Sequence, residues 1–132
     1  MKPSSAKGKG RRLQNFLKEK IYEYFPILRD GDVKTAVMGE SGEDIILSPA
    51  ARDLIPYSFE CKNQERLNIW ESLSQAEDNS GDFTPAVVFK RNRTKTYIAL
   101  ELEEFLNIIG EKNEWTWKKK TTLYGDRSFY VS

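Results

Sequence analysis

Apolar residues near the start of the chain recur every three or four positions, as they do along one face of a helix. They are Leu13, Phe16, Leu17, Ile21 and Tyr24. This spacing predicts an amphipathic helix over residues 11–24, which Pro26 prevents from continuing. Residues 1–10 are rich in Lys, Ser and Gly and lack this period, so we expect a flexible basic arm there.

Short apolar runs, several of them alternating with polar residues, predict five strands farther along the chain. They lie within "VKTAVMG", "GEDIILS", "YSFECKN", "PAVVFKRN" and "TKTYIALEL". A short helical turn is predicted in "SPAARDLIP", with Ser48 as its cap. A longer helix is predicted from Ile69 to Ala76, and a last one in "LEEFLNIIG", ended by Gly110. The order helix, three strands, helix, two strands, helix indicates an α/β domain with a mixed central sheet flanked by helices.

The length of 132 residues suits one domain. We expect that domain over residues 11–110, followed by a C-terminal extension over residues 111–132 that could add a strand or hairpin. No apolar stretch is long enough to span a bilayer, and "MKPSSAKGKGRR" lacks the apolar segment of a secretory signal. We therefore expect a soluble, cytoplasmic protein that does not bind membranes.

Two residue counts exclude much of the usual hydrolytic chemistry. The chain has no histidine, which excludes Ser-His and Cys-His catalysis and His-ligated zinc. Its one cysteine, Cys61, can form neither an internal disulfide nor a thiolate cluster. Any metal would have oxygen ligands, which favours Mg²⁺ or Mn²⁺.

Positive charge is sorted along a chain whose net charge is only +1. One cluster occupies the first dozen residues, a second lies in "KRNRTK" and a third in "WTWKKK". The residues of the first two clusters that we expect to contact nucleic acid are Lys7, Lys9, Arg11, Arg12, Lys90, Arg91, Arg93 and Lys95. Sorted positive charge indicates a polyanionic partner. Each cluster alone is equally typical of a solvated tail or a hairpin turn, so both interpretations stay open.

The stretch "YSFECKN" places an acid and a base two positions apart in a predicted strand. Because side chains alternate between the two faces of a strand, Glu60 and Lys62 share one face. The other face carries Tyr57, Phe59 and Cys61, which we expect in the core.

A second acid, Asp44, begins the apolar run that we expect to form the neighbouring strand. Two carboxylates at adjacent strand ends repel each other unless a cation lies between them, and a divalent ion that keeps several waters suits such a site. Such an ion could activate a water for attack on a phosphodiester, while Lys62 orients that water or stabilises the developing charge. A Glu and a Lys two positions apart are by themselves far more often a solvated strand face. Asp44, the polar Gln75 on the next helix and the basic clusters favour the catalytic interpretation.

The segment "GEDIIL", followed by "FECKN", resembles the PD-(D/E)XK nuclease superfamily. Residues 9–109, from the end of the basic arm through "SQAE" to "VVFKRNRTKTYIALELEEFL", look like the small Holliday junction resolvases, in particular the resolvase-like nucleases of bacteriophages. The resemblance implies a restriction-endonuclease-like core and Mg²⁺-dependent cleavage of four-way or other branched DNA. It also implies a homodimer, whose two sites suit the two strands to be cut, and the host cytoplasm as its location.

The same resemblance assigns roles to individual residues. It gives Asp44, Glu60 and Lys62 the central catalytic positions, with the two acids as metal ligands. Gln75 matches a glutamine often found on the helix after the ExK motif. Ser41, in "GESGED", resembles the loop residue that approaches the scissile phosphate.

One position departs from the family pattern, which commonly has a glutamate on the first helix where this chain has Gln14. A glutamine can hold a metal-bound water but adds no charge, so Glu19 and Glu40 remain alternatives for completing the metal site. Two classes of function therefore stay open: a metal-dependent endonuclease, and a weakly active or inactive nuclease-like protein that binds nucleic acid. RNA as the substrate is also compatible with the sequence.

Overall fold

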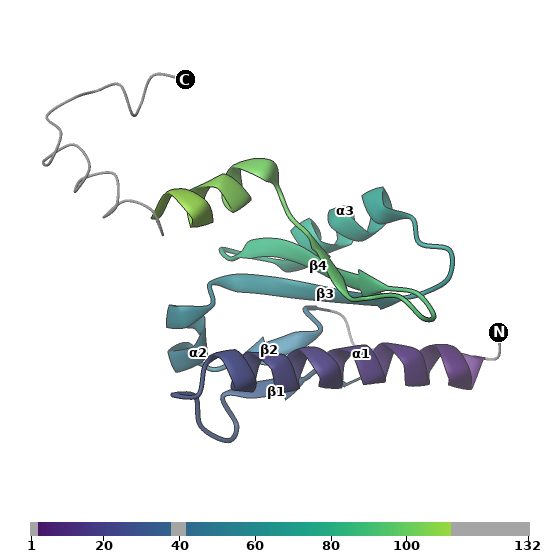
Figure 1. The fold of residues 1–132 in the computed structure, drawn as a ribbon, viewed down its shortest axis with the longest axis horizontal. Helices are drawn as coiled ribbons and strands as arrows, with labels where there is room; N and C mark the ends of the chain where they lie inside the picture. Colours follow the sequence, from purple (N-terminus) through teal and green to yellow (C-terminus); the bar gives the residue numbers. More distant parts are fainter. Residues whose placement is uncertain (1–2, 38–41, 112–132) are drawn as a thin grey trace, which may run out of the picture. The chain divides into compact units, whose positions relative to one another are not determined.

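The computed structural model describes residues 3–37 and 42–111. The chain divides into two compact units at residues 100 and 101, and each unit is described by itself. The elements of the first unit are α1 (Pro3–Tyr24), β1 (Val33–Thr35), β2 (Ile45–Leu47), α2 (Pro49–Leu54), β3 (Tyr57–Asn63), α3 (Ile69–Asn79), β4 (Thr84–Lys90) and β5 (Tyr97–Ala99) (Figure 1). The predicted α/β class and the predicted order of helices and strands are confirmed.

The first helix starts earlier than its apolar period indicates, at Pro3. Proline is tolerated in a first helical turn because the N–H that it lacks has no partner there. Gly8 and Gly10 each cost a helix about 1 kcal/mol relative to alanine, so packing must stabilise this part of α1. The side chain of Asn63 donates a hydrogen bond to the carbonyl of Lys9 at 3.0 Å, and Lys9 is only 6% exposed. Residues 3–10, within the segment expected to be a flexible arm, are thus helical, and Lys9 is docked against β3.

The strands form two sheets rather than the single central sheet that we expected. β1 and β2 pair antiparallel in a two-stranded sheet. β3 pairs in parallel with β4 over its whole length, and β4 pairs antiparallel with β5. Parallel neighbours need a crossover connection, and α3 supplies it between β3 and β4. The predicted mixed sheet is therefore confirmed for β3, β4 and β5.

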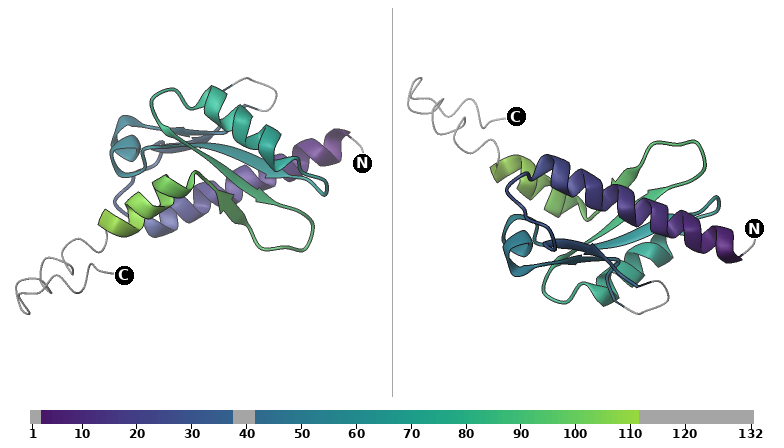
Figure 2. Two further views of the ribbon diagram at one scale, coloured as in Figure 1. Left: turned by 90° about the horizontal axis from the view of Figure 1, so that it is seen from above. Right: turned by 90° about the horizontal axis from the view of Figure 1, so that it is seen from below.

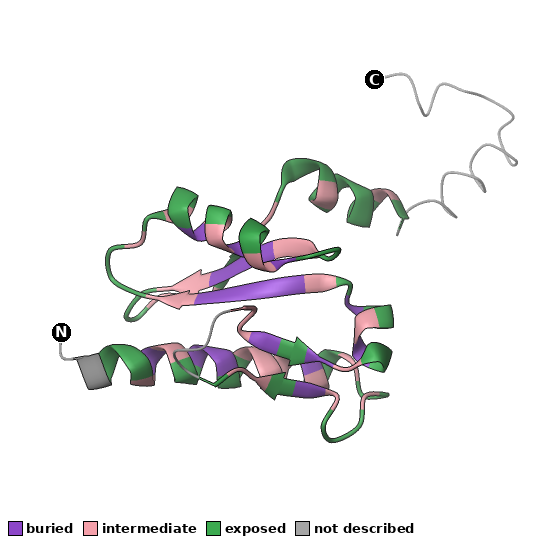
Figure 3. Ribbon diagram, turned by 180° about the vertical axis from the view of Figure 1, so that it is seen from behind, coloured by how far each residue is buried: buried purple, intermediate pink, exposed green. Residues whose placement is uncertain are grey.

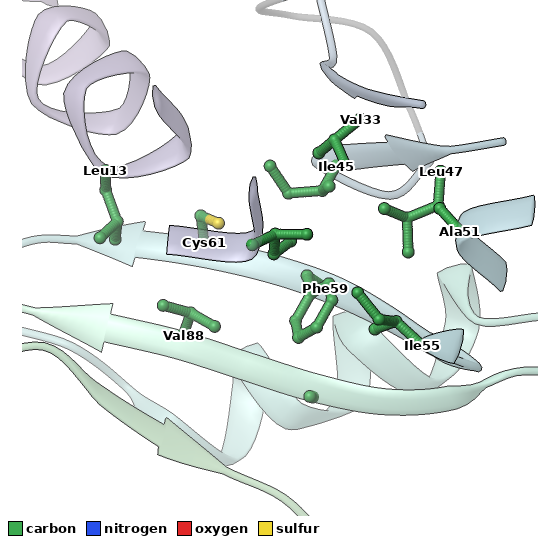
Figure 4. Close-up of a cluster of buried hydrophobic side chains, with 11 residues drawn as sticks. Leu13, Val33, Ile45, Leu47, Ala51, Ile55, Phe59, Cys61 and Val88 are labelled. Atoms are coloured by element: carbon green, nitrogen blue, oxygen red, sulfur yellow. The ribbon is translucent and has the colours of Figure 1, made fainter. Parts of the chain in front are cut away.

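The core lies between the three-stranded sheet and a layer made of α1, β1 and β2. Its buried members from all these elements are Leu13, Ile21, Val33, Ile45, Leu47, Ala51, Ile55, Phe59, Cys61, Ala86 and Val88 (Figure 4). α3 contacts β3 and β4 from the opposite face, so β3 is buried along most of its length (Figures 2 and 3). This double coverage explains why a strand with charged residues is an interior element.

The second unit contains a helix over residues 102–111, which continues through Gly110, where the sequence predicted its end. The expected extra strand or hairpin after residue 111 lies outside the described residues. None of the described helices has the length and apolar character needed to cross a membrane.

Candidate active site

β3 carries the acid–base pair on the face that α3 covers. Phe59 and Cys61 belong to the core on the α1 side, so strand alternation places Ser58, Glu60 and Lys62 on the other side. Glu60 is only 8% exposed. Because a solvated strand face would leave both charges in water, the burial of Glu60 argues against the ordinary explanation of this pair.

Asp44 lies at the edge of β3 that is not paired with β4. Its N–H donates to the carbonyl of Phe59 at 2.9 Å, and its Oδ2 accepts the N–H of Cys61 at 2.6 Å. Its carbonyl accepts the N–H of Ala36 at 2.9 Å, beyond the end of β1. The Asp44 side chain thus takes the place of a backbone strand partner at the Cys61 N–H, at the point where the two sheets are not paired. It also brings the second carboxylate beside Glu60, as the sequence predicted.

The two carboxylates perturb each other. Burial raises the pKa of Glu60, and the nearby charge of Asp44 raises it further. The ammonium of Lys62 and a hydrogen bond from Asn79 act in the opposite direction. Burial also raises the pKa of Asp44, although the Cys61 N–H and Lys62 favour its ionised form. In both groups burial has the larger effect on the pKa, so ionising these carboxyl groups costs free energy, and a bound cation would lower that cost.

The contacts of Glu60 leave one of its oxygens available. Lys62 Nζ lies 3.6 Å from Glu60 Oε1, in a largely buried ion pair. Asn79, the last residue of α3, lies near the Glu60 carboxylate and lowers its pKa by favouring the ionised form. Glu60 Oε2 is buried and has no hydrogen-bond partner among the described residues. An unpartnered buried carboxylate oxygen costs free energy, and a bound cation would remove that cost.

The donor set fits a hard divalent ion. Within residues 3–37 and 42–111, no group of three or more Asp, Glu or Cys side chains is placed to hold a metal. Mg²⁺ is commonly bound through one or two carboxylates while it keeps several waters. Asp44 and Glu60 match that pattern, since both are fixed by neighbouring groups and both have oxygens left for coordination.

The other expected site residues are distributed differently. Gln75 is half-buried on α3, one turn before Asn79 and on the same face of the helix. Gln14 is buried on α1, with 4% exposure, and its amide oxygen has no hydrogen-bond partner in the described part of the chain. Glu19 is exposed. Ser41 and Glu40 lie outside the described residues.

The basic residues are mostly at the surface. Exposed or half-buried are Lys7, Arg11, Arg12, Lys90, Arg91, Arg93 and Lys95. Lys9 is the exception, since its ammonium is buried and has no hydrogen-bond partner among the described groups. Arg12 of α1 and both Lys90 and Lys95 of the β4–β5 hairpin line one groove. Two clusters far apart in the sequence therefore meet in the fold.

Sequence reasoning missed Asn79, which lies near the buried Glu60 and lowers its pKa. Its spacing of four residues from Gln75 was a usable signal, because both fall on the helix face that packs on β3 and β4. That signal becomes specific only once the docking of α3 is known.

The functional assignment rests on the geometry of Asp44, Glu60 and Lys62, because no similar protein supports it. A comparison of the chain with family models, with curated proteins and with solved structures finds no match.

Proposed function

We propose that the protein is a divalent-metal-dependent endonuclease that hydrolyses phosphodiesters in branched DNA. The observation that carries this proposal is the cluster of the buried Glu60 with the half-buried Asp44 and Lys62, in which two carboxylates with raised pKa values lie near one ammonium. A restriction-endonuclease-like core belongs to the same proposal. It is supported by the order of the elements and by the parallel pairing of β3 with β4.

The residues of the cluster would have separate roles. Asp44 and Glu60 would hold the ion, with Glu60 Oε2 as the ligand atom that has no other partner. A bound Mg²⁺ or Mn²⁺ supplies Lewis-acid chemistry and a water of lowered pKa. Asn79, near the Glu60 carboxylate, would favour its ionised form, which is the form that holds an ion.

Lys62 is the group that would act on the substrate. Its ammonium is near Glu60 but remains partly accessible, with 19% of its side-chain surface exposed. A phosphodiester gains negative charge on its oxygens as a nucleophile attacks, and a fixed ammonium in a poorly solvated site stabilises that charge. Lys62 would also orient the attacking water by donating a hydrogen bond to it.

DNA is the substrate that the charge distribution favours. The exposed cations of α1 and of the β4–β5 turn would bind phosphates independently of sequence, which leaves selection to the shape of the DNA. Branched DNA with two strands to cut suits a symmetric homodimer, and a second copy of this chain is therefore part of the proposal.

A cleavage assay tests the proposal. Purified protein is incubated with a labelled four-way junction, a duplex and a single strand, each with Mg²⁺ and with EDTA, beside Lys62→Ala and Lys34→Ala. Lys34 is an exposed cation on β1 and is the matched control. The expected result is Mg²⁺-dependent nicking of the junction by the wild type and Lys34→Ala, with a loss of about 100-fold or more in Lys62→Ala.

Three results would contradict it. Junction binding without nicks at any metal or protein concentration would favour a binding protein that is not an enzyme. The uncharged Gln14 at a position where the family commonly has glutamate is compatible with that alternative. Equal activity of Lys62→Ala and wild type would remove the proposed site. Cleavage of an RNA junction in preference to DNA would change the substrate class.

A further inference from the structure

A groove lies between α1 and the β4–β5 hairpin, within the first unit. Its volume is about 670 Å³, within the range of ligand-binding sites. Its charged and aromatic lining residues are Arg12, Phe16, Lys20, Tyr24, Lys90 and Lys95. Among the described residues no Asp or Glu lines it, so a polyanion is the ligand that its charge favours. We infer that this groove binds an unpaired strand of nucleic acid, with phosphates on its cations and bases stacked on its two aromatic rings.

The α1 wall of the groove alternates aromatic and basic residues. Phe16, Lys20 and Tyr24 are spaced four apart and form one ridge, along which the two aromatic residues are about 12 Å apart at 1.5 Å per residue. Their exposed fractions are 42% and 73%. Lys20 Nζ lies 5.6 Å from the centre of the Phe16 ring and 3.1 Å from Glu23. The ridge thus offers two exposed rings, of which Phe16 has one face covered by Lys20, and Lys20 is paired with the exposed Glu23 until a phosphate displaces it.

The opposite wall is fixed before any ligand binds. Thr94 Oγ1 accepts the N–H of Arg91 at 3.2 Å and donates to the carbonyl of Lys95 at 2.9 Å. The N–H of Asn92 donates to Glu65 at 3.2 Å, which ties the turn to the segment after β3. A fixed turn loses little conformational entropy on binding, so its cations are preorganised for phosphate.

The aromatic rings distinguish a single strand from a duplex. In a duplex the bases are stacked on each other and their faces are covered. Unpaired bases expose both faces, and stacking on protein aromatics is the usual way in which single strands are held without sequence preference. Cations alone would bind either form, so Phe16 and Tyr24 are the reason for choosing the single strand.

This groove and the acidic cluster lie on different faces of the three-stranded sheet. Asn63 lines the groove and hydrogen-bonds to α1, whereas Glu60 and Lys62 point to the α3 side. Binding in the groove therefore requires neither a metal nor cleavage. The inference about the groove is independent of whether the protein cuts DNA.

Fluorescence anisotropy in EDTA tests the inference with a short labelled oligo(dT) and a duplex of the same length. Tyr24→Ala should weaken oligo(dT) binding roughly 5- to 100-fold, the usual effect of losing one stacked base, and leave duplex binding unchanged. Lys95→Ala should reduce the slope of log K against log salt by about 0.7, as expected for one lost phosphate contact on a single strand. The matched controls are Trp70→Ala, an 80% exposed aromatic on α3, and Lys34→Ala.

Each of these binding measurements can contradict the inference. The inference is overturned if the wild type does not bind oligo(dT), or if Tyr24→Ala binds it as well as Trp70→Ala does. Equal weakening of oligo(dT) and duplex binding by Tyr24→Ala would show that the groove holds a duplex. Asp44→Asn should bind oligo(dT) like the wild type, so that loss of cleavage and loss of groove binding are separable.

Discussion

Asp44 has two roles that two substitutions can separate. Its Oδ2 accepts the N–H of Cys61, a residue with 8% exposure. Its ionised carboxylate is also destabilised by burial, which raises its pKa. Asp44→Asn can keep the acceptor and removes the charge. Asp44→Ala removes both, so it leaves the Cys61 N–H without its partner.

The expected difference in stability between the two variants follows from the Cys61 N–H. Leaving a buried donor unpaired costs about 1–3 kcal/mol, so Asp44→Ala should be less stable than Asp44→Asn by this amount. For a unit of this size each kcal/mol corresponds to about 4–8 °C in Tm. Because the folded protein disfavours the ionised Asp44, Asp44→Asn should be at least as stable as the metal-free wild type at neutral pH.

Thermal unfolding in EDTA, followed by circular dichroism, measures the three proteins side by side. The expected order of Tm is Asp44→Asn equal to or above wild type, with Asp44→Ala lowest. Equal Tm values for the two variants would refute the structural role of the Cys61 hydrogen bond. A strong loss of stability in Asp44→Asn would refute the claim that the buried charge is a cost.

Other parts of the structure make further predictions. Glu60→Gln should raise the Tm of the metal-free protein at neutral pH, since Glu60 also has a raised pKa; a lower Tm would mean that its ion pair outweighs its burial. The folded-state pKa values of Asp44 and Glu60 exceed their unfolded-state values, so their contribution to stability is full below the unfolded values and is lost as pH rises through the folded ones. Urea unfolding should accordingly show the metal-free wild type losing stability, relative to the Asp44→Asn/Glu60→Gln double variant, between acidic and neutral pH. Leu13→Ala should cost about 3–5 kcal/mol in urea unfolding because Leu13 is 2% exposed in the core; a cost under about 1 kcal/mol would contradict this packing. Ser48→Ala should cost about 1–2 kcal/mol in the same assay, since Ser48 caps α2 by accepting the N–H of Ala51; no loss would mean that the cap is replaced.

The helices and strands were largely predictable from periodicity, because Leu13 and Ile21 of α1 and Phe59 of β3 pack in the core as their spacing indicates. Periodicity did not predict which apolar residues stay at the surface, since Phe16 and Tyr24 share the spacing of α1 and are exposed. The early start of α1 was not predicted either, since it depends on contacts between Lys9 and Asn63, which are far apart in the sequence. The separation of the two sheets was also missed. At this point the side chain of Asp44 replaces a backbone partner on β3, and no hydrophobic pattern can indicate such a contact.

The grouping of the residues in the acidic site could be predicted from the sequence, but their burial and contacts could not. Strand alternation alone places Glu60 and Lys62 together, and the start of the preceding strand places Asp44 nearby. The burial of Glu60 and the contact from Asn79 depend on how α3 docks, which is a tertiary property. The groove was also predicted only in part, since charge clustering indicated Arg12, Lys90 and Lys95 but neither Lys20 nor the exposed aromatic residues beside it.

Whether Asp44 and Glu60 form one metal site is tested most directly by isothermal titration calorimetry of Mg²⁺ into the wild type, Asp44→Asn, Glu60→Gln and the double variant. Saturable binding by the wild type, weakened at least about 10-fold in each single variant and scarcely further in the double variant, is the predicted result, because neighbouring ligands of one ion are not additive. Mg²⁺ binding of wild-type strength in either single variant, or additive losses in the double variant, would contradict a shared site.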